Sequence, residues 1–324
     1  MANITMLATE FILQGFSDIR EHQILHAVLF ILIYLTALVG NLLIVLLTTF
    51  DQHLHSPMHF FLRTLSFLDV CFISVTVPKA ITQSLTQDSS ISFLGCIAQV
   101  FLVVLFACTE LALLTVMSYD RYTAICHPLH YQLIMRKGAC EQMVAASWFS
   151  GIVSGFLNTS ATFSLSFCGS NFVHQFFCEI PPLLKLACSE KFLAEFGAII
   201  ITTSLGIMCF ICILVSYIHI FSTVLRIPSV EGRSKAFSTC IPHLLVVSIF
   251  LNTGSIAYLK PVPKSPSIWN LMVSVFYTVV PPTLNPIIYS LKNKDMKAAF
   301  WRMLRKTAFI FSNKITIIKI APKV

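Results

Sequence analysis

Seven long runs with almost no charged residues constrain this chain more than any other feature. Each is about as long as the roughly 20 apolar residues that cross a hydrocarbon core about 30 Å thick. A mean hydropathy of +0.81, with 56% hydrophobic and 11% charged residues, is likewise typical of a membrane protein. We therefore predict an all-α membrane protein folded as a bundle of seven transmembrane helices. The predicted spans are His26–Phe50, Met58–Lys79, Cys96–Ile125, Cys140–Phe163, Phe196–Leu225, Ala236–Leu259 and Ile268–Leu291.

The spans divide the chain into three regions. Residues 1–25 precede the bundle, residues 26–291 form it, and residues 292–324 follow it as a tail. In Asn293–Lys306 apolar residues recur at intervals of three and four among Lys and Arg. This spacing predicts a short amphipathic helix after the seventh span, lying on the inner membrane surface.

The distribution of Lys and Arg predicts the orientation, because cytoplasmic loops near the membrane carry an excess of these residues. With the amino terminus outside, 16 of the 22 lie on the inner side and 6 on the outer side. Asn3, in the sequon Asn3-Ile4-Thr5, then lies where glycosylation takes place. We predict a multi-pass plasma-membrane protein with an extracellular amino terminus. Topology and contact with anionic membrane lipid explain the net charge of +8, which therefore indicates no nucleic-acid partner.

Four cysteines lie on the predicted outer side. Cys96 stands at the outer end of the third span, and the long connection between spans four and five holds Cys168, Cys178 and Cys188. Four cysteines in an oxidising compartment are enough for two disulfides, and three pairings are possible. The other seven cysteines lie within or just inside the membrane, where we expect them to be reduced.

Two carboxylates lie in the middle of predicted spans, Asp69 in the second and Glu110 in the third. An ionisable group in hydrocarbon is costly, so each must be protonated, paired or bound to a cation. If the two spans face each other, the carboxylates could share a proton or a sodium ion, or they could simply fix helix packing. No nucleophile or metal-ligand cluster accompanies them, so we predict that the chain is not an enzyme.

Polar and helix-kinking residues also mark the inner ends of two spans. Asp120 and Arg121 stand at the inner end of the third span, where the arginine can pair with its neighbour or face a cytoplasmic partner. Asn285 and Pro286 lie near the inner end of the seventh, where the proline removes a helix hydrogen bond, and Tyr289 follows one turn later. We interpret these residues as a candidate switch and hinge.

Together these residues resemble a rhodopsin-like (class A) G-protein-coupled receptor of the vertebrate odorant receptor family, over nearly the whole chain. The strongest match is Met117–Leu129, MSYDRYTAICHPL. His59 and Thr123 depart from the family pattern, which usually has Tyr and Val there, and we expect any effect to fall on inner-loop packing or signalling efficiency. The other matching segments are Gly40-Asn41, Leu54–Leu62, Leu65-Ser66, Ser216-Tyr217, Lys235–Cys240 with His243, and Pro282–Ser290.

The resemblance implies roles for several of these residues. Cys96 would bond Cys178, and Cys168 would bond Cys188. Asp69 and Glu110 would form a polar site in the middle of the membrane. Arg121 would leave Asp120 and engage a stimulatory heterotrimeric G protein of the cyclic AMP pathway. The residues expected to rearrange with it are Tyr217, His243, Asn285, Pro286 and Tyr289.

The resemblance also implies a ligand pocket in the outer half of the bundle, beneath the second outer loop. Most of its expected residues are apolar and none is charged, which favours a volatile odorant with one hydrogen-bonding group. Two alternatives stay open: a receptor of the same fold for another small molecule, and a transporter. The expected ligand-binding residues are Val103, Val104, Ala107, Cys108, Thr202, Leu205, Leu251, Gly254, Ser255, Tyr258 and Thr278.

Overall fold

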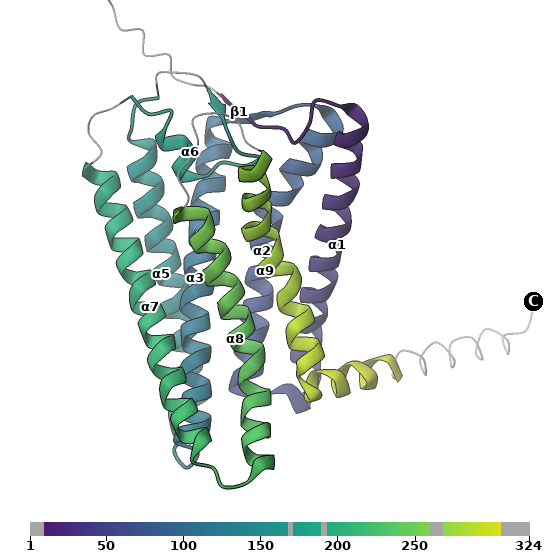
Figure 1. The fold of residues 1–324 in the computed structure, drawn as a ribbon, viewed down its shortest axis with the longest axis vertical. Coiled ribbons are helices and arrows are strands. Elements are labelled where there is room, and N and C mark those ends of the chain that lie inside the picture. The colour runs from purple at the N-terminus through teal and green to yellow at the C-terminus, as the bar shows by residue number, and fades with distance from the viewer. Residues whose placement is uncertain (1–9, 168–170, 189–192, 260–267, 306–324) are drawn as a thin grey trace, which may run out of the picture.

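Long helices that run side by side dominate the fold (Figure 1). The computed structural model describes residues 10–167, 171–188, 193–259 and 268–305. Each predicted span lies inside one long helix of this described part. The long helices are α1 (Arg20–Phe50), α2 (Pro57–Thr86), α3 (Phe93–Cys126), α5 (Lys137–Phe163), α7 (Leu193–Leu225), α8 (Val230–Leu259) and α9 (Ile268–Lys292).

Several helices extend beyond the predicted apolar runs. α1 begins at Arg20 rather than His26, and α2 continues past Lys79 to Thr86. The difference arises because hydropathy marks only the part that crosses hydrocarbon, whereas backbone hydrogen bonding continues into the polar flanks. Pro57 is at the first turn of α2, where its missing N–H leaves no helix bond unmade, and Gln87 ends the helix with a φ of 62°.

Six of these helices are long and apolar enough to cross a membrane: α1, α2, α3, α7, α8 and α9. The chain is therefore a multi-pass membrane protein. The remaining long helix, α5, has 27 residues and holds the predicted fourth span, but it is not among the six. Five of its polar side chains are buried against neighbouring helices, while Phe149 and Phe156 are exposed. The buried polar residues of α5 are Ser147, Ser154, Asn158, Thr159 and Thr162.

Three short strands form a small sheet at one end of the bundle, which we call the sheet end. β1 (Glu10–Leu13) pairs antiparallel with β2 (Ser90–Ser92) and parallel with β3 (Phe172–Val173). The short helix α6 (Ile180–Leu184) lies at the same end (Figure 1). No strand was predicted from the sequence, because runs of two to four residues carry too little periodicity to be recognised.

α3 packs against α2, α5, α7 and α8. Its approach to α5 is close at Gly151, where an added Cβ would collide with the Thr109 side chain and come within 2.5 Å of the Leu105 carbonyl oxygen. Only glycine leaves room for this approach, and small residues commonly allow such packing between membrane helices.

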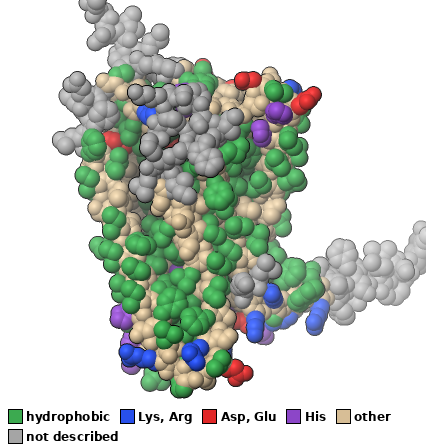
Figure 2. Space-filling model, in the orientation of Figure 1, with side chains coloured by type: hydrophobic (Ala, Val, Ile, Leu, Met, Phe, Trp, Pro, Cys, Tyr) green, Lys and Arg blue, Asp and Glu red, His purple; other side chains and the backbone are tan. Residues whose placement is uncertain are grey.

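The opposite end of the bundle carries the basic side chains, and we call it the basic end. In Figure 2 apolar side chains cover the middle of the visible face, and Lys and Arg gather toward this end. After α9, residues 294–305 form a further helix that turns away from the bundle axis (Figure 1). Its Met296 and Ala299 are buried, and the Arg302 Nε donates a hydrogen bond of 2.8 Å to Asp51 after α1. This bond lowers the pKa of the Asp51 carboxyl and ties the helix to the first loop at the basic end.

Candidate functional site

Asp120 and Arg121 form an ion pair at the basic end of α3. The Arg121 Nε donates to Asp120 Oδ2 at 3.0 Å, and its Nη2 bonds the same oxygen. The other carboxylate oxygen, Oδ1, accepts a 2.8 Å hydrogen bond from the Tyr131 hydroxyl of α4 (Tyr131–Ile134). The Asp120 side chain is 1% exposed and that of Arg121 is 13% exposed. The guanidinium must therefore leave Asp120 before it can bind a partner.

Tyr217 and His243 connect three helices on the side of this pair that faces the sheet end. The Tyr217 hydroxyl of α7 is 2.7 Å from His243 Nδ1 of α8, and the His243 Nε2 is 3.0 Å from the backbone oxygen of Leu114 in α3. Both side chains are buried. An outward movement of α8 would break one or both contacts, so they stabilise the arrangement seen here.

The two carboxylates predicted to lie in mid-membrane meet at one amide. Asn285 of α9 donates from Nδ2 to both oxygens of Asp69, at 3.1 and 3.0 Å, and to Glu110 Oε1 at 3.4 Å. All three side chains are at most 2% exposed. The Asn285 Oδ1 is buried and has no hydrogen-bond partner among the described residues. The structure thus brings helices α2, α3 and α9 together around a polar centre.

Asn41 has a role at the α9 kink that was not predicted from the sequence. Pro286 has no N–H, so the Pro282 carbonyl four residues earlier loses its helix partner. The Asn41 amide of α1 donates to that carbonyl at 2.8 Å. Gly40 allows this approach, because an added Cβ there would lie about 3.0 Å from the Pro286 ring. The pairing of Gly40-Asn41 with a distant proline could have been found only from covariation between related sequences. The hydroxyl of Tyr289, one turn on, is buried without a hydrogen-bond partner among the described residues.

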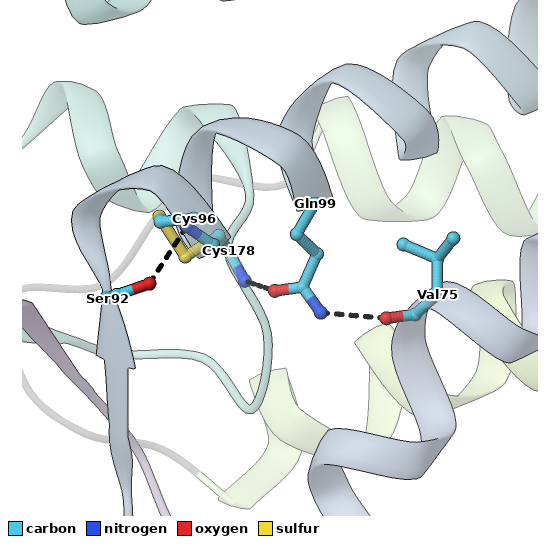
Figure 3. The surroundings of a disulfide bond; sticks show 6 residues. Val75, Ser92, Cys96, Gln99 and Cys178 are labelled. Atoms are coloured by element: carbon cyan, nitrogen blue, oxygen red, sulfur yellow. Dashed lines mark hydrogen bonds between the residues drawn. A yellow bond between two sulfur atoms is a disulfide. The ribbon is translucent and has the colours of Figure 1, made fainter.

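The disulfide between Cys96 and Cys178 joins α3 to the connection between α5 and α7 (Figure 3). Gln99, one turn along α3, uses both atoms of its side-chain amide to hold the segment around this disulfide. Its Oε1 accepts from the Cys178 backbone N–H at 2.8 Å, and its Nε2 donates to the Val75 carbonyl of α2 at 2.9 Å. Ser92 caps the start of α3 by accepting from the Gly95 N–H. The predicted Cys96–Cys178 pairing is therefore confirmed.

The other predicted covalent features fall wholly or partly outside the described residues. Cys188 is disulfide-bonded, but Cys168, its expected partner, lies outside the described part of the chain. Asn3, the predicted glycosylation site, also lies outside it. The seven cysteines expected to be reduced are free thiols: Cys71, Cys108, Cys126, Cys140, Cys209, Cys212 and Cys240.

The three residues before Cys178 fill the sheet end of the bundle. Phe176 and Phe177 are 0% exposed, and Phe177 packs edge to face against Tyr277 of α9. The Gln175 amide bonds the Ser274 hydroxyl of α9. These contacts hold the loop segment against α9, where it covers the sheet end of the bundle.

Glu179 is a buried carboxyl in the same segment, and its burial was not predicted. Burial raises its pKa from the ordinary value near 4.5 to about 7, and a hydrogen bond from the Tyr277 hydroxyl opposes that rise. The sequence signal was weak because Glu179 lies in a loop, where acidic residues are usually exposed.

The expected ligand residues are spread over three kinds of position. Val103, Val104 and Thr278 are buried, and Thr278 donates to the Ser274 carbonyl. Ala107, Cys108, Leu251 and Gly254 are partly buried within the bundle, and Ser255 is exposed. The Tyr258 side chain lies outside the described part.

Two expected ligand residues of α7 face away from the bundle centre. Thr202 accepts a 2.7 Å hydrogen bond from the Asn158 amide of α5, so its hydroxyl is directed to the α5 interface. Leu205 is 44% exposed on the outer surface of α7. Helical periodicity fixes which residues share a face, but only the rotation of α7 in the bundle decides which face points inward.

A family model described as olfactory receptor matches residues 30–307 of this chain. The chain belongs to the olfactory receptor family. Olfactory receptors are class A G-protein-coupled receptors, so the chain is a signalling receptor and not an enzyme, as predicted.

Three human olfactory receptors are similar over nearly their full length. Olfactory receptor 14A16 is 58% identical over 305 residues, which cover 94% of this chain and 98% of the relative. Olfactory receptor 14L1 is 59% identical over 293 residues, 90% of each chain. Olfactory receptor 14J1 is 54% identical over 306 residues, 94% of this chain and 95% of the relative.

In this olfactory receptor three of the features described above lie along the helix α3. The covered sheet end, the Asp69–Glu110–Asn285 centre and the Asp120–Arg121 pair follow one another along α3, which contributes Cys96, Glu110 and Arg121. Because α3 contacts most other helices, a change at either end reaches the same helix. This arrangement suits a receptor that transmits a signal from one side of a membrane to the other.

Proposed function

We propose that this olfactory receptor binds a small, weakly polar volatile in the half of the bundle toward the sheet end and activates a stimulatory G protein at the basic end. The observation that carries the proposal is the position of three of the expected ligand residues between the loop cover and the switch residues. Val103, Val104 and Thr278 are buried there, and none of the expected residues is charged. A charged ligand would lose its hydration without gaining a partner, whereas a weakly polar one would not.

The orientation is the second part of the proposal. The sheet end is extracellular and the basic end is cytoplasmic, since positively charged residues favour the cytoplasmic side. α5 crosses the membrane as the fourth of seven spans, because five of its polar side chains are buried between helices. Asn3 is glycosylated, and the helix at residues 294–305 lies on inner-leaflet lipid with its exposed Lys297 and Arg305 near anionic headgroups.

The mechanism is a shift between two conformations. The ligand binds the active conformation more tightly, in which α8 has moved outward, the contacts of His243 with Tyr217 and Leu114 are lost, and Arg121 has left Asp120 for the G protein. Ligand binding can shift this equilibrium only by the difference between its affinities for the two conformations. The resulting signal is synthesis of cyclic AMP.

Screening a panel of volatiles tests the proposed function. Cells that express the receptor with a stimulatory G protein are expected to accumulate cyclic AMP with at least one uncharged volatile that carries an alcohol, aldehyde, ketone or ester group. Cells without the receptor are the control. Activation only by charged or involatile molecules would contradict the odorant assignment and favour a receptor for another class of small molecule.

We further propose that the Asp69–Glu110–Asn285 centre holds a sodium ion in the inactive receptor. The two carboxylates supply negatively charged oxygens, and the Asn285 Oδ1, which has no partner among the described residues, supplies a neutral one. Oxygen ligands suit hard cations. Among the described residues, no cluster of three or more His, Cys, Asp or Glu could hold a metal. The two carboxylates therefore need the Asn285 amide oxygen to complete the site.

Thermal unfolding in sodium and in potassium salts tests this site. The purified receptor is expected to unfold at a higher temperature in sodium, because an ion that binds only the folded state stabilises it. Asp69→Asn is expected to remove the difference. Glu195→Gln is the matched control, since Glu195 is a buried carboxylate held by Thr162 at the α5–α7 interface. Equal unfolding temperatures in both salts for the unmodified receptor would rule sodium out in favour of a shared proton.

A further inference from the structure

Among the described residues, a groove between α7 and α8 is lined only by residues of these two helices. It has a volume of about 350 Å³, within the range of roughly 300–1,000 Å³ for small-molecule sites. In Figure 1 α8 is drawn in front of α3, with α7 beside it. Two groove residues, Leu251 and Ser255, belong to the expected ligand set, and the others do not.

The mouth of the groove faces the bilayer. Phe210 and Leu214 of α7 line it and are 45% and 47% exposed. Both helices lie within membrane-spanning segments over this stretch. A molecule that enters between them therefore comes from the hydrocarbon of the bilayer.

Three polar residues of α8 line the same groove at helical spacing. Ser248, Asn252 and Ser255 recur at intervals of four and three and are all exposed, so they share one face. Asn252 donates to the Ser248 carbonyl oxygen at 2.7 Å. The second N–H and the oxygen of its amide, and both serine hydroxyls, make no hydrogen bond to another described residue. An unsatisfied polar group in hydrocarbon is unfavourable, so a ligand that bonds one of these groups is stabilised by that contact.

A ligand that enters the bundle at the sheet end meets more contacts than one that enters between α7 and α8. Phe176 and Phe177 fill it with 0% exposure, and the disulfide at Cys178 holds them against α3. Gln175 donates a hydrogen bond to α9 and Glu179 accepts one from it, and these bonds fix the segment on both sides of the aromatic pair. Entry past this segment would require these contacts to open, whereas entry between α7 and α8 would not.

We propose that the α7–α8 groove is a membrane-facing binding site for an uncharged molecule with an alkyl chain and one hydrogen-bonding group, which reaches it through the bilayer. The chain packs against Phe210 and Leu214, and the polar group bonds Asn252 or a neighbouring serine. Tyr217 lines the groove and bonds His243, so an occupant also touches a residue that connects α7 to α8. The inference rests on the proposed function only for the class of ligand.

Photolabelling with an octanol that carries a diazirine tests the groove directly. In the full receptor in phosphatidylcholine nanodiscs, label is expected on the peptides that contain Phe210–Tyr217 and Ser248–Ser255, and excess unlabelled octanol is expected to displace it. Leu214→Trp is expected to remove most of this label by filling the groove. Asn252→Leu is expected to weaken binding about two- to twelvefold, because it removes one hydrogen bond of about 0.5–1.5 kcal/mol.

Val215→Trp is the matched control. Val215 is the next residue of α7, is 46% exposed and does not line the groove, so labelling is expected to be unchanged. Label spread over the lipid-facing residues of every helix, and not displaced by octanol, would overturn the proposal. The displacement test on the unmodified receptor decides the matter even if a tryptophan variant fails to reach the membrane. Groove labelling is measured independently of signalling. If a receptor that is activated by volatiles shows no groove labelling, this site is refuted and the proposed function is not.

Discussion

Replacing Arg121 with alanine is expected to lower cyclic AMP signalling at least about fivefold, both without ligand and with any volatile that activates the unmodified receptor. Arg121 is the cation that pairs with Asp120 here and that we expect to engage the G protein after release. Coupling free energies between sites are about 1–3 kcal/mol, so loss of the contact predicts a fall of about fivefold to a hundredfold or more. Cyclic AMP accumulation, normalised to receptor at the cell surface, measures it.

Two further variants separate this role from a general effect of charge. Asp120→Asn is expected to raise signalling without ligand, because it weakens the bond that holds Arg121. Lys137→Ala should leave signalling unchanged, since Lys137 is 90% exposed at the same end and contacts only Glu141 at 3.9 Å among the ion pairs found in the described residues. An Arg121→Ala receptor that signals fully at normal surface level would refute the mechanism.

Replacing Cys178 with serine is expected to remove most of the receptor from the cell surface. The disulfide closes a long loop, since its cysteines are separated by 82 positions in sequence, and loss of a native disulfide typically costs about 2–5 kcal/mol. A loss of about 1–2 kcal/mol already changes cellular abundance several-fold. The Gln99 bond to the Cys178 N–H is also weakened when the segment is no longer held. Surface labelling by an antibody to an amino-terminal tag measures the effect.

The pairing itself is tested by combining variants. Cys96→Ser and the double variant should lose as much surface receptor as Cys178→Ser, because either change removes the same bond. Cys212→Ser is the control, since Cys212 is a free, exposed thiol of α7. Additive losses in the double variant, or a normal surface level for Cys178→Ser, would contradict a structural role for this disulfide.

Hydropathy predicted every long helix of the described part, because a membrane span must satisfy its backbone hydrogen bonds internally over a fixed length. It placed the ends less well, as at Arg20, where the helix continues outside hydrocarbon. It also treated α5 like the other spans, although buried polar residues such as Asn158 make this helix less apolar than the six membrane-length helices. The small sheet formed by β1, β2 and β3 was missed because its strands are short and distant in sequence.

For the candidate site, sequence alone determined which polar residues had to find partners. Asp69, Glu110 and Arg121 stood out because unpaired charge is costly in a membrane. The family motifs then implied the Cys96–Cys178 bond among three possible pairings. Both steps depend on residue type and order, which the sequence contains.

Only the tertiary structure decided which groups meet. It placed the Asn285 amide between Asp69 and Glu110, directed Asn41 to the carbonyl that Pro286 leaves without a partner, and turned Leu205 outward. It also left a groove between α7 and α8 with Asn252 on its wall. These features depend on how each helix is rotated and how closely it packs, and those are set by the combined shape of all neighbouring helices rather than by any one segment.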